Sequence, residues 1–184
     1  MELNSLQPER DLLRSQIKNE YANVVYSQTC QEEQRNSLTK LEKRIKVAQI
    51  SLSALSTTGV LGIVFLQHTW VTATTAVVTF FSLVLNSYSL HFEIGEKAAR
   101  HRKAGDQLWL LERKYLSLLV DFNGLETVDI QKRRDALIKE TYEIYGSIER
   151  TDDKSFQKAQ KRLKNGLKEF SQEELNQLLP SELR

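Results

Sequence analysis

The feature that most constrains this chain is a run of 46 residues without one charged side chain, from Val47 to Phe92. Lys, Arg, Asp and Glu make up 27% of the whole sequence, so their absence here is a property of the segment and not of the composition. A helix on the surface of a soluble protein needs a polar face toward water. The run therefore indicates a segment that water does not surround.

The uncharged run divides into two pieces, 47–67 and 71–92, joined by a turn at 68–70. Each piece has the length of about 20 residues that a helix needs to span a bilayer. Because the turn is short, the two helices should run antiparallel as a transmembrane hairpin, with Trp70 at the membrane interface. A buried helical hairpin of a soluble protein is the alternative, since the first piece contains Gln49 and several hydroxyl residues.

Positive charge flanks the hairpin at its open end only. The turn has no lysine or arginine, whereas both outer flanks do: Lys40, Lys43, Arg44, Lys46, Lys97, Arg100, Arg102 and Lys103. By the positive-inside rule, both termini are expected to be cytoplasmic. The chain then divides into a cytosolic N-terminal helix (1–46), the hairpin (47–92) and a cytosolic helical region (93–184).

The second piece carries more hydrogen-bonding side chains than a lipid-facing helix needs. Six of them, here called the polar stripe, follow one helix face at spacings of three and four residues: Thr72, Thr75, Thr79, Ser82, Asn86 and Ser89. A Ser or Thr hydroxyl can bond back to its own helix, but the Asn86 amide should seek a partner or water. The polar stripe is either a packing seam or the lining of a water-filled passage, and both require neighbouring helices.

The spacing of the polar stripe continues beyond the hairpin, which predicts that one unbroken helix leaves the membrane. The continuing positions are Glu93, Glu96, Arg100, Lys103 and Gln107. From the end of the N-terminal helix through the first piece, small and apolar residues are expected to form a continuous seam: Leu38, Leu41, Ile45, Ala48, Leu52, Leu55, Gly59, Gly62 and Leu66.

Helix-forming residues dominate the rest of the chain, and two prolines and seven glycines leave little material for β-turns, so we predict an all-α fold. A helix from about Pro8 should continue into the membrane without a break. Its middle should be wet, because several of its seam positions are polar: Glu20, Ser27, Gln31 and Gln34.

Downstream of the hairpin, the spacing of apolar residues predicts a helix that continues to a break at 123–126. Its predicted apolar side consists of Leu108, Leu111, Tyr115, Leu118, Leu119 and Phe122. The next helix, 127–148, should bury Ile130, Leu137, Ile138, Tyr142 and Tyr145. A helix capped within 151–153 should end near Gly166, and a last one should start with the capping box at Ser171 and stop at Pro180.

Catalytic motifs are absent from the sequence: it contains no P-loop, GxGxxG, CxxC or HExxH. The three histidines are scattered, and the single Cys30 can form no intrachain disulfide and fits a buried thiol better than a reactive one. We therefore predict no catalytic residues, no metal site and no cofactor, and we do not expect an enzyme.

Two basic groups near the C-terminus are candidate contacts for an anionic ligand or lipid. They are Lys132, Arg133 and Arg134 in one predicted helix, and Lys158, Lys161 and Arg162 in the next. Solvated helix faces are the alternative, because acidic residues lie close to both groups and dilute their charge.

The layout as a whole resembles the SLATT family, the two-transmembrane effector domains of prokaryotic conflict systems. The resemblance rests on EKAARHRKAGDQLWLLERKYLSLL (96–119), directly after the second span, and on the closing LNQLLPSELR (175–184). It covers the long N-terminal helix, the hairpin and the charged helix that follows. The match resembles the subfamily found beside reverse transcriptases, and the family has no catalytic residues to carry over.

The resemblance implies an effector of a bacterial antiviral or abortive-infection system, in the inner membrane with both termini cytoplasmic. A sensor, such as a reverse transcriptase or a nucleotide-signalling enzyme, would trigger a homo-oligomer that forms a pore or permeabilises the membrane. Membrane lipid is a further expected partner, and direct contact with nucleic acid is not expected. With this family in view, pore lining becomes the favoured role of the polar stripe.

Two other functions stay open at this stage. The chain could be a non-conducting membrane anchor or scaffold that recruits a partner protein through its cytosolic helices. It could instead be a soluble helical protein that binds a nucleotide or nucleic acid through the lysines of 154–168.

Overall fold

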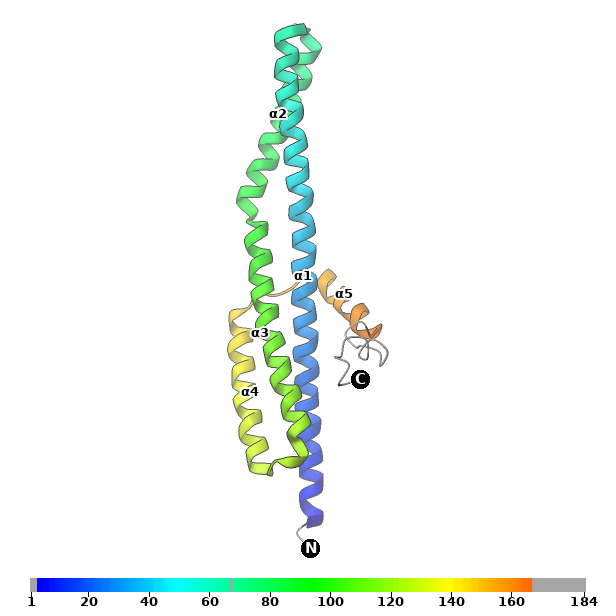
Figure 1. The fold of residues 1–184 in the computed structure, drawn as a ribbon, viewed down its shortest axis with the longest axis vertical. Helices are drawn as coiled ribbons and strands as arrows, with labels where there is room; N and C mark the ends of the chain where they lie inside the picture. Colours follow the sequence, from blue (N-terminus) through cyan, green and yellow to red (C-terminus); the bar gives the residue numbers. More distant parts are fainter. Residues whose placement is uncertain (1–2, 67, 167–184) are drawn as a thin grey trace, which may run out of the picture. The chain divides into compact units, whose positions relative to one another are not determined.

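The computed structural model of the protein describes residues 3–66 and 68–166 of the 184. The described residues are almost entirely helical and contain no strand, which confirms the all-α prediction (Figure 1). In chain order the elements are α1 (Leu3–Leu66), α2 (Thr69–Phe92), α3 (Ile94–Asp121), the short 3-10 helix η1 (Phe122–Gly124), α4 (Thr127–Ser147) and α5 (Asp153–Lys164). Two compact units share α1: the hairpin unit, residues 35–100, and the helical unit, residues 1–34 with 101–184.

Helix α1 runs for 64 residues without a break, as the sequence predicts. It begins at Leu3, so Pro8 lies inside the helix and does not mark its first turn. The predicted start at Pro8 is therefore about one turn too late. Pro8 is the sixth residue of α1, beyond the four N–H groups at the helix start that have no partner within it, so it removes one backbone hydrogen bond from the second turn.

The core of the helical unit is formed by α1, α3 and α4, which lie side by side (Figure 1). Its fully or nearly buried members are Leu13, Ile17, Val24, Leu108, Leu111, Tyr115, Leu118, Phe122, Ile130 and Leu137. The predicted apolar side of α3 is confirmed, with Leu119 packed against this core from its edge. The break after α3 and the start of α4 at Thr127 also agree with the prediction.

The predicted buried side of α4 is only partly correct. Ile130 and Leu137 are buried, but three predicted members are exposed, by 36%, 80% and 39%: Ile138, Tyr142 and Tyr145. The buried face passes through Thr141 instead, whose hydroxyl lies 3.1 Å from Tyr115 Oη. A polar residue is stable at this buried position because it forms a hydrogen bond with the Tyr115 hydroxyl.

The polar middle of α1 is less exposed to solvent than predicted, because Gln31 is buried and Glu20, Ser27 and Gln34 are half-buried. Ser27 Oγ accepts a 2.7 Å hydrogen bond from Tyr145 Oη near the end of α4. Gln34 Oε1 accepts one of 3.1 Å from the backbone N–H of Asp152. The polar side chains of α1 thus hold the end of α4 and the connection to α5, which an apolar seam could not bind.

Gln31 lies between these two contacts and is buried. Its Nε2 donates to the carbonyl of Glu149 at 2.9 Å, and its Oε1 lies 2.5 Å from Nδ1 of the buried His101 on α3. Because an amide oxygen only accepts, this contact requires a hydrogen on Nδ1. His101 Nε2 is 3.8 Å from a carboxylate oxygen of Glu149. One glutamine therefore joins α1, α3 and the α4–α5 connection.

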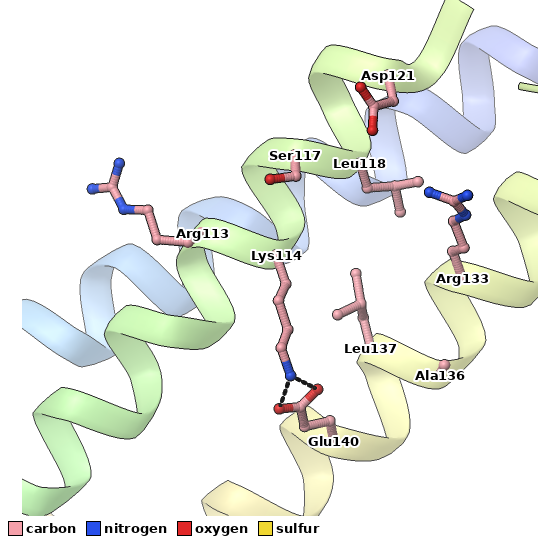
Figure 2. Close-up of a pocket in the computed structure, with 9 residues that line it drawn as sticks. All are labelled: Arg113, Lys114, Ser117, Leu118, Asp121, Arg133, Ala136, Leu137 and Glu140. Atoms are coloured by element: carbon pink, nitrogen blue, oxygen red, sulfur yellow. Dashed lines mark hydrogen bonds and ion pairs between the residues drawn. The ribbon is translucent and has the colours of Figure 1, made fainter. Parts of the chain in front are cut away.

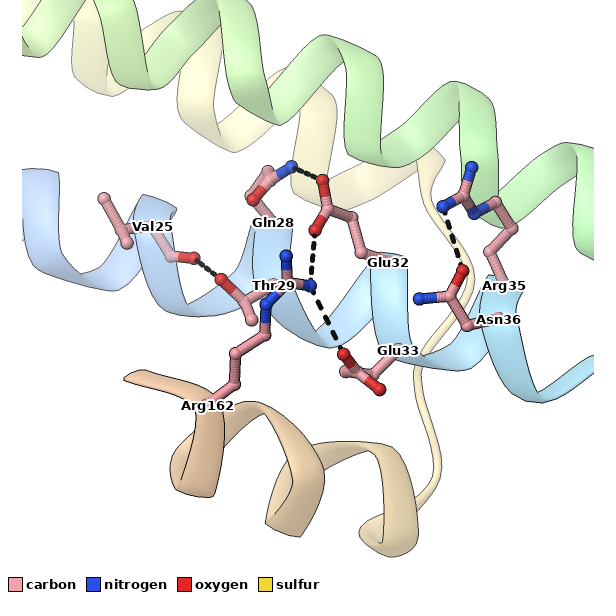
Figure 3. Close-up of polar contacts among 8 residues, drawn as sticks. All are labelled: Val25, Gln28, Thr29, Glu32, Glu33, Arg35, Asn36 and Arg162. Atoms are coloured by element: carbon pink, nitrogen blue, oxygen red, sulfur yellow. Dashed lines mark hydrogen bonds and ion pairs between the residues drawn. The ribbon is translucent and has the colours of Figure 1, made fainter. Parts of the chain in front are cut away.

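Helix α5 packs on α1 through a small apolar patch and one arginine. Ser155 and Ala159 are fully buried, and the rings of Phe156 and Tyr26 are 5.0 Å apart. Arg162 Nη1 contacts Glu32 Oε2 at 3.0 Å and Glu33 Oε1 at 3.3 Å, as Figure 3 shows. These charge-assisted contacts fix the C-terminal end of α5 on α1.

Asp152 is the N-cap of α5, as the sequence predicts. Its Oδ1 accepts a 2.7 Å hydrogen bond from the backbone N–H of Ser155. Burial opposes ionisation of this carboxyl, but the hydrogen bonds donated to it hold the pKa of Asp152 below its usual value. The last predicted helix, from Ser171 to Pro180, lies outside the described residues.

We expect Asp152→Ala to speed hydrogen exchange of the α5 amides about fivefold, because a lost N-cap costs about 1 kcal/mol. Asp152→Asn is the matched control, since asparagine caps equally well. Because the pKa of Asp152 is lowered by folding, its carboxylate stabilises α5 fully at a pH above the unfolded-state pKa of about 3.9. This stabilisation is lost as the pH falls through the lower pKa of the folded state. Acid should therefore loosen α5 in the parent but not in Asp152→Asn. Equal exchange in the parent and Asp152→Ala at pH 7 would contradict the capping role.

Candidate functional site

The two helices of the hairpin unit are long enough to cross a membrane and turn their apolar surface outward. The most apolar stretch of the first helix has no buried residue within the chain. In the most apolar stretch of the second helix, only 11% is buried. The core helix of a soluble protein would be mostly buried. Val77, Phe80, Phe81 and Val84 are exposed on α2, as predicted for lipid-facing side chains. A continuous apolar surface of this kind indicates contact with lipid or with other helices.

Small residues bring α1 and α2 close together. A Cβ added at Gly59 would overlap Thr75 Oγ1 and lie 2.9 Å from Thr75 Cγ2, and one added at Gly62 would lie 3.3 Å from Val71 Cγ1. The helices therefore approach more closely than larger side chains would allow. Ile45 is buried in this contact as predicted, but Leu41 and Leu55 are exposed, so the predicted seam of α1 is wrong at these two positions.

The close approach divides the polar stripe in two. Thr75 and Ser82 are buried against α1 and Ser89 is half-buried, whereas the other three members are exposed: Thr72, Thr79 and Asn86. These three, here called the outer stripe, are spaced seven residues apart, which places them on one line along α2. Within one chain, α1 thus shelters only half of the stripe.

Several threonine hydroxyl groups in the hairpin are satisfied by their own helices. Thr75 Oγ1 donates to the carbonyl of Val71 at 2.8 Å, and Thr79 Oγ1 donates to that of Thr75 at 2.9 Å. Thr57 and Thr58 on α1 bond back in the same way, at 3.0 Å each. The Asn86 side chain carries two donors and a carbonyl, which one helix cannot satisfy in this manner.

The helix that leaves the hairpin is interrupted at Glu93, so the predicted unbroken helix is wrong. Glu93 adopts a left-handed conformation (φ 44°, ψ 43°) between α2 and α3. A left-handed residue breaks the regular spacing of the side chains that face α1. These side chains are five residues apart across the break, from Ser89 to Ile94, and four apart after it, from Ile94 to Ala98. Glu96 and Arg100 are exposed on α3, but the stripe of α2 does not continue into them as one face.

The basic residues predicted as anion contacts are not gathered in one place. Arg162 is held by Glu32 and Glu33 at the α5–α1 contact. Arg134 contacts Asp135 Oδ1 at 2.7 Å and Gln16 Oε1 at 3.0 Å. The remaining four are exposed, two on α4 and two on α5: Lys132, Arg133, Lys158 and Lys161.

Sequence reasoning missed a groove between α3 and α4 in the helical unit, with a volume of about 410 Å³ (Figure 2). Arg133 is one of its lining residues. No signal in the sequence marks this groove, because its two walls, 113–121 and 133–140, lie on different helices and meet only through helix packing.

Cys30 is buried, and burial raises the pKa of its thiol to about 11, so the thiol is protonated at neutral pH. Within residues 3–66 and 68–166, no group of three or more His, Cys, Asp or Glu side chains is placed to hold a metal ion.

Two long, outward-facing apolar helices on an all-helical chain define a two-span helical protein of the membrane type. Over residues 13–174 the chain matches the family described as "SMODS and SLOG-associating 2TM effector domain family 4", and it therefore belongs to this SLATT family of two-transmembrane effector domains. The resemblance found in the sequence is confirmed at the level of the family, and the subfamily beside reverse transcriptases stays a prediction. Neither a curated protein nor a solved structure matches the chain.

The contact between Gly59 and Thr75 gives a test of the hairpin. Gly→Ala inside a helix normally stabilises by about 1 kcal/mol, but here the added Cβ would overlap Thr75 and cost about 1–3 kcal/mol. We expect Gly59→Ala to destabilise the parent and to be neutral or stabilising in a Thr75→Ala background. SDS-driven unfolding of the full chain in mixed micelles measures both effects. If the two substitutions are additive, the helices do not approach at this point.

Proposed function

We propose that the chain is an oligomeric effector that forms a pore in, or otherwise permeabilises, the bacterial inner membrane in response to a cytosolic signal. The observation that carries the proposal is the outer stripe: Thr72, Thr79 and Asn86 stay exposed on a lipid-facing helix after α1 has covered the other half of the stripe. Membership of a family of membrane effector domains supports the same function.

The outer stripe is costly for a single chain in a bilayer. An amide without hydrogen-bond partners in an apolar medium costs about 2–7 kcal/mol, depending on the reference state. Lipid tails supply no such partner, whereas a neighbouring α2 or water does. A line of polar residues repeating every seven positions fits helices that pack around a common axis. Several copies of α2 would then shelter Asn86 and surround a polar passage.

The proposed topology places both termini in the cytoplasm, because the positive charges flank the open end of the hairpin. The helical unit would receive the trigger from a sensor, such as a reverse transcriptase or a nucleotide-signalling enzyme. The effect would be physical, through rearrangement of α2 helices about the outer stripe, and would need no catalytic residue in this chain.

A non-conducting anchor or scaffold is the second candidate function. The outer stripe would then be a packing seam, since small hydroxyl residues and asparagine also hold membrane helices together. The soluble alternative is disfavoured, because it leaves the exposed apolar surface of both hairpin helices without a covering partner.

Asn86→Leu separates these functions, and Ser87→Leu is its matched control because Ser87 is also exposed but lies outside the stripe. Interhelical polar contacts contribute about 1–2 kcal/mol each, so over several subunits their loss should lower the conductance on the order of tenfold. We expect induced expression of the parent and of Ser87→Leu to collapse the membrane potential, measured with a voltage-sensitive dye. Asn86→Leu should insert normally, by carbonate extraction, but leave the potential largely intact.

Two outcomes oppose the proposal. A parent chain that inserts without changing the potential, even when its sensor is co-expressed and activated, would support the scaffold. Equal depolarisation by Asn86→Leu and Ser87→Leu would show that the outer stripe does not line the passage. Ser82 is left unchanged in these tests, because it is buried against α1 and its replacement would disturb the hairpin itself.

A further inference from the structure

The groove between α3 and α4 has the composition of a small-ligand site. Its floor is apolar, formed by Leu118, Ala136 and Leu137, and its rim is polar (Figure 2). A volume of about 410 Å³ with a mostly apolar lining and a few polar groups is typical of sites for small organic molecules. A partner helix would need a longer apolar track than this groove offers.

The rim of the groove carries charges of both signs, and two of its three cations are already paired. Three cations, Arg113, Lys114 and Arg133, face two carboxylates, Asp121 and Glu140. Lys114 Nζ is held by both carboxylate oxygens of Glu140, at 2.7 and 2.8 Å, and is thereby neutralised. Arg113 is likewise 3.1 Å from the carboxylate of Glu112.

Arg133 is the cation of the rim that is left for a ligand. It makes no ion pair within 4.0 Å with any residue in the part of the chain that the structure describes. Figure 2 shows its side chain extending from α4 toward Leu118 and Asp121 on α3. Its guanidinium therefore lies beside the apolar floor, where it could bind an oxyanion in two-point contact.

We propose that this groove binds a small amphiphilic anion, with one carboxylate or phosphate head and an apolar body. The head pairs with Arg133, and the Ser117 hydroxyl on the same rim is a second donor. The body lies on Leu118, Ala136 and Leu137. The occupant is a free amphiphile from water, because the groove holds a molecule of limited size and one cation of its rim, Arg133, has no ion pair with the described residues and matches one anionic head.

Another of the cavities of about this size has no such unpaired arginine among its described lining residues. It lies between α1, α3 and α5, and its arginines are Arg113 and Arg162. Both are already held by carboxylates, Arg113 by Glu112 and Arg162 by Glu32 and Glu33. An anion there would have to displace an ion pair, whereas at Arg133 it would not.

Photo-crosslinking tests the proposal in the full chain, reconstituted in phosphatidylcholine nanodiscs. The probe is octanoate that carries a diazirine, and peptide mass spectrometry locates the label. We expect labelling in the peptides that contain Leu118 and Leu137. Octanoate and octyl phosphate should compete with the probe about fivefold better than octanol, since an exposed ion pair contributes at most about that factor. Octyltrimethylammonium should not compete.

Arg133→Gln should weaken labelling of the groove about fivefold, by loss of the ion pair. Lys132→Gln is the matched control, because it removes the same charge from an exposed neighbour outside the groove. Ala136→Leu should block labelling by filling the floor, and both it and Arg133→Gln concern exposed positions that need not disturb folding. Thermal unfolding in the same nanodiscs checks this.

Three results would overturn the proposal: equal labelling of Arg133→Gln and Lys132→Gln, equal competition by octanol and octanoate, or label confined to the hairpin helices. The last would mean that the probe only enters the bilayer. None of these readouts depends on membrane potential, so the groove and the proposed pore can each fail while the other stands.

Discussion

The close approach of α1 and α2 at Gly59 and Thr75 is the contact on which the membrane part of this protein depends. Because a glycine faces a threonine there, α1 covers one edge of the polar stripe and leaves the other edge outside. A bulkier residue at position 59 would rotate or separate the helices, and a different set of hydroxyls would be sheltered. The contact therefore decides which polar groups a bilayer or a second copy of the chain meets.

The helical unit depends on a different kind of contact, in which polar side chains of α1 form hydrogen bonds with polar groups of the segments packed on it. Ser27, Gln31 and Gln34 follow one face of α1, and each binds a group near the end of α4 or the start of α5. A short connection exposes backbone N–H and carbonyl groups that an apolar surface would leave unsatisfied. Placing amides and a hydroxyl on α1 solves this, and Arg162 then secures α5 by its two glutamates.

Glu93 shows how one residue can separate two helices that share a pattern. A non-glycine residue in the left-handed conformation costs about 1 kcal/mol, and it is retained where surrounding packing requires it. Here the packing includes Gly95, at which a Cβ would lie 3.0 Å from Glu42 Oε1. The polar stripe of α2 and the charged face of α3 are consequently two surfaces, and a function assigned to one does not extend to the other.

The fold class and most helix boundaries followed from the sequence because they depend on local physics. Absence of charge marked the spans, Asp152 marked the start of α5, and the apolar period of α3 marked its buried side. Tyr142 and Ile138 were misplaced because Thr141 supplies the hydrogen bond that Tyr115 needs, and the sequence does not show that pair. Leu41 and Leu55 were misplaced because a seven-residue spacing fixes a face but not the partner it meets.

By itself, then, the sequence determined the two spans, the helices around them and the six members of the polar stripe. Only the tertiary structure decided that Thr75 and Ser82 are hidden while Thr72, Thr79 and Asn86 are exposed, and that Arg133 borders a groove while Arg162 is bound by glutamates. Helix periodicity is a property of neighbouring residues, whereas exposure and ion pairing depend on which distant helix arrives, and at what distance.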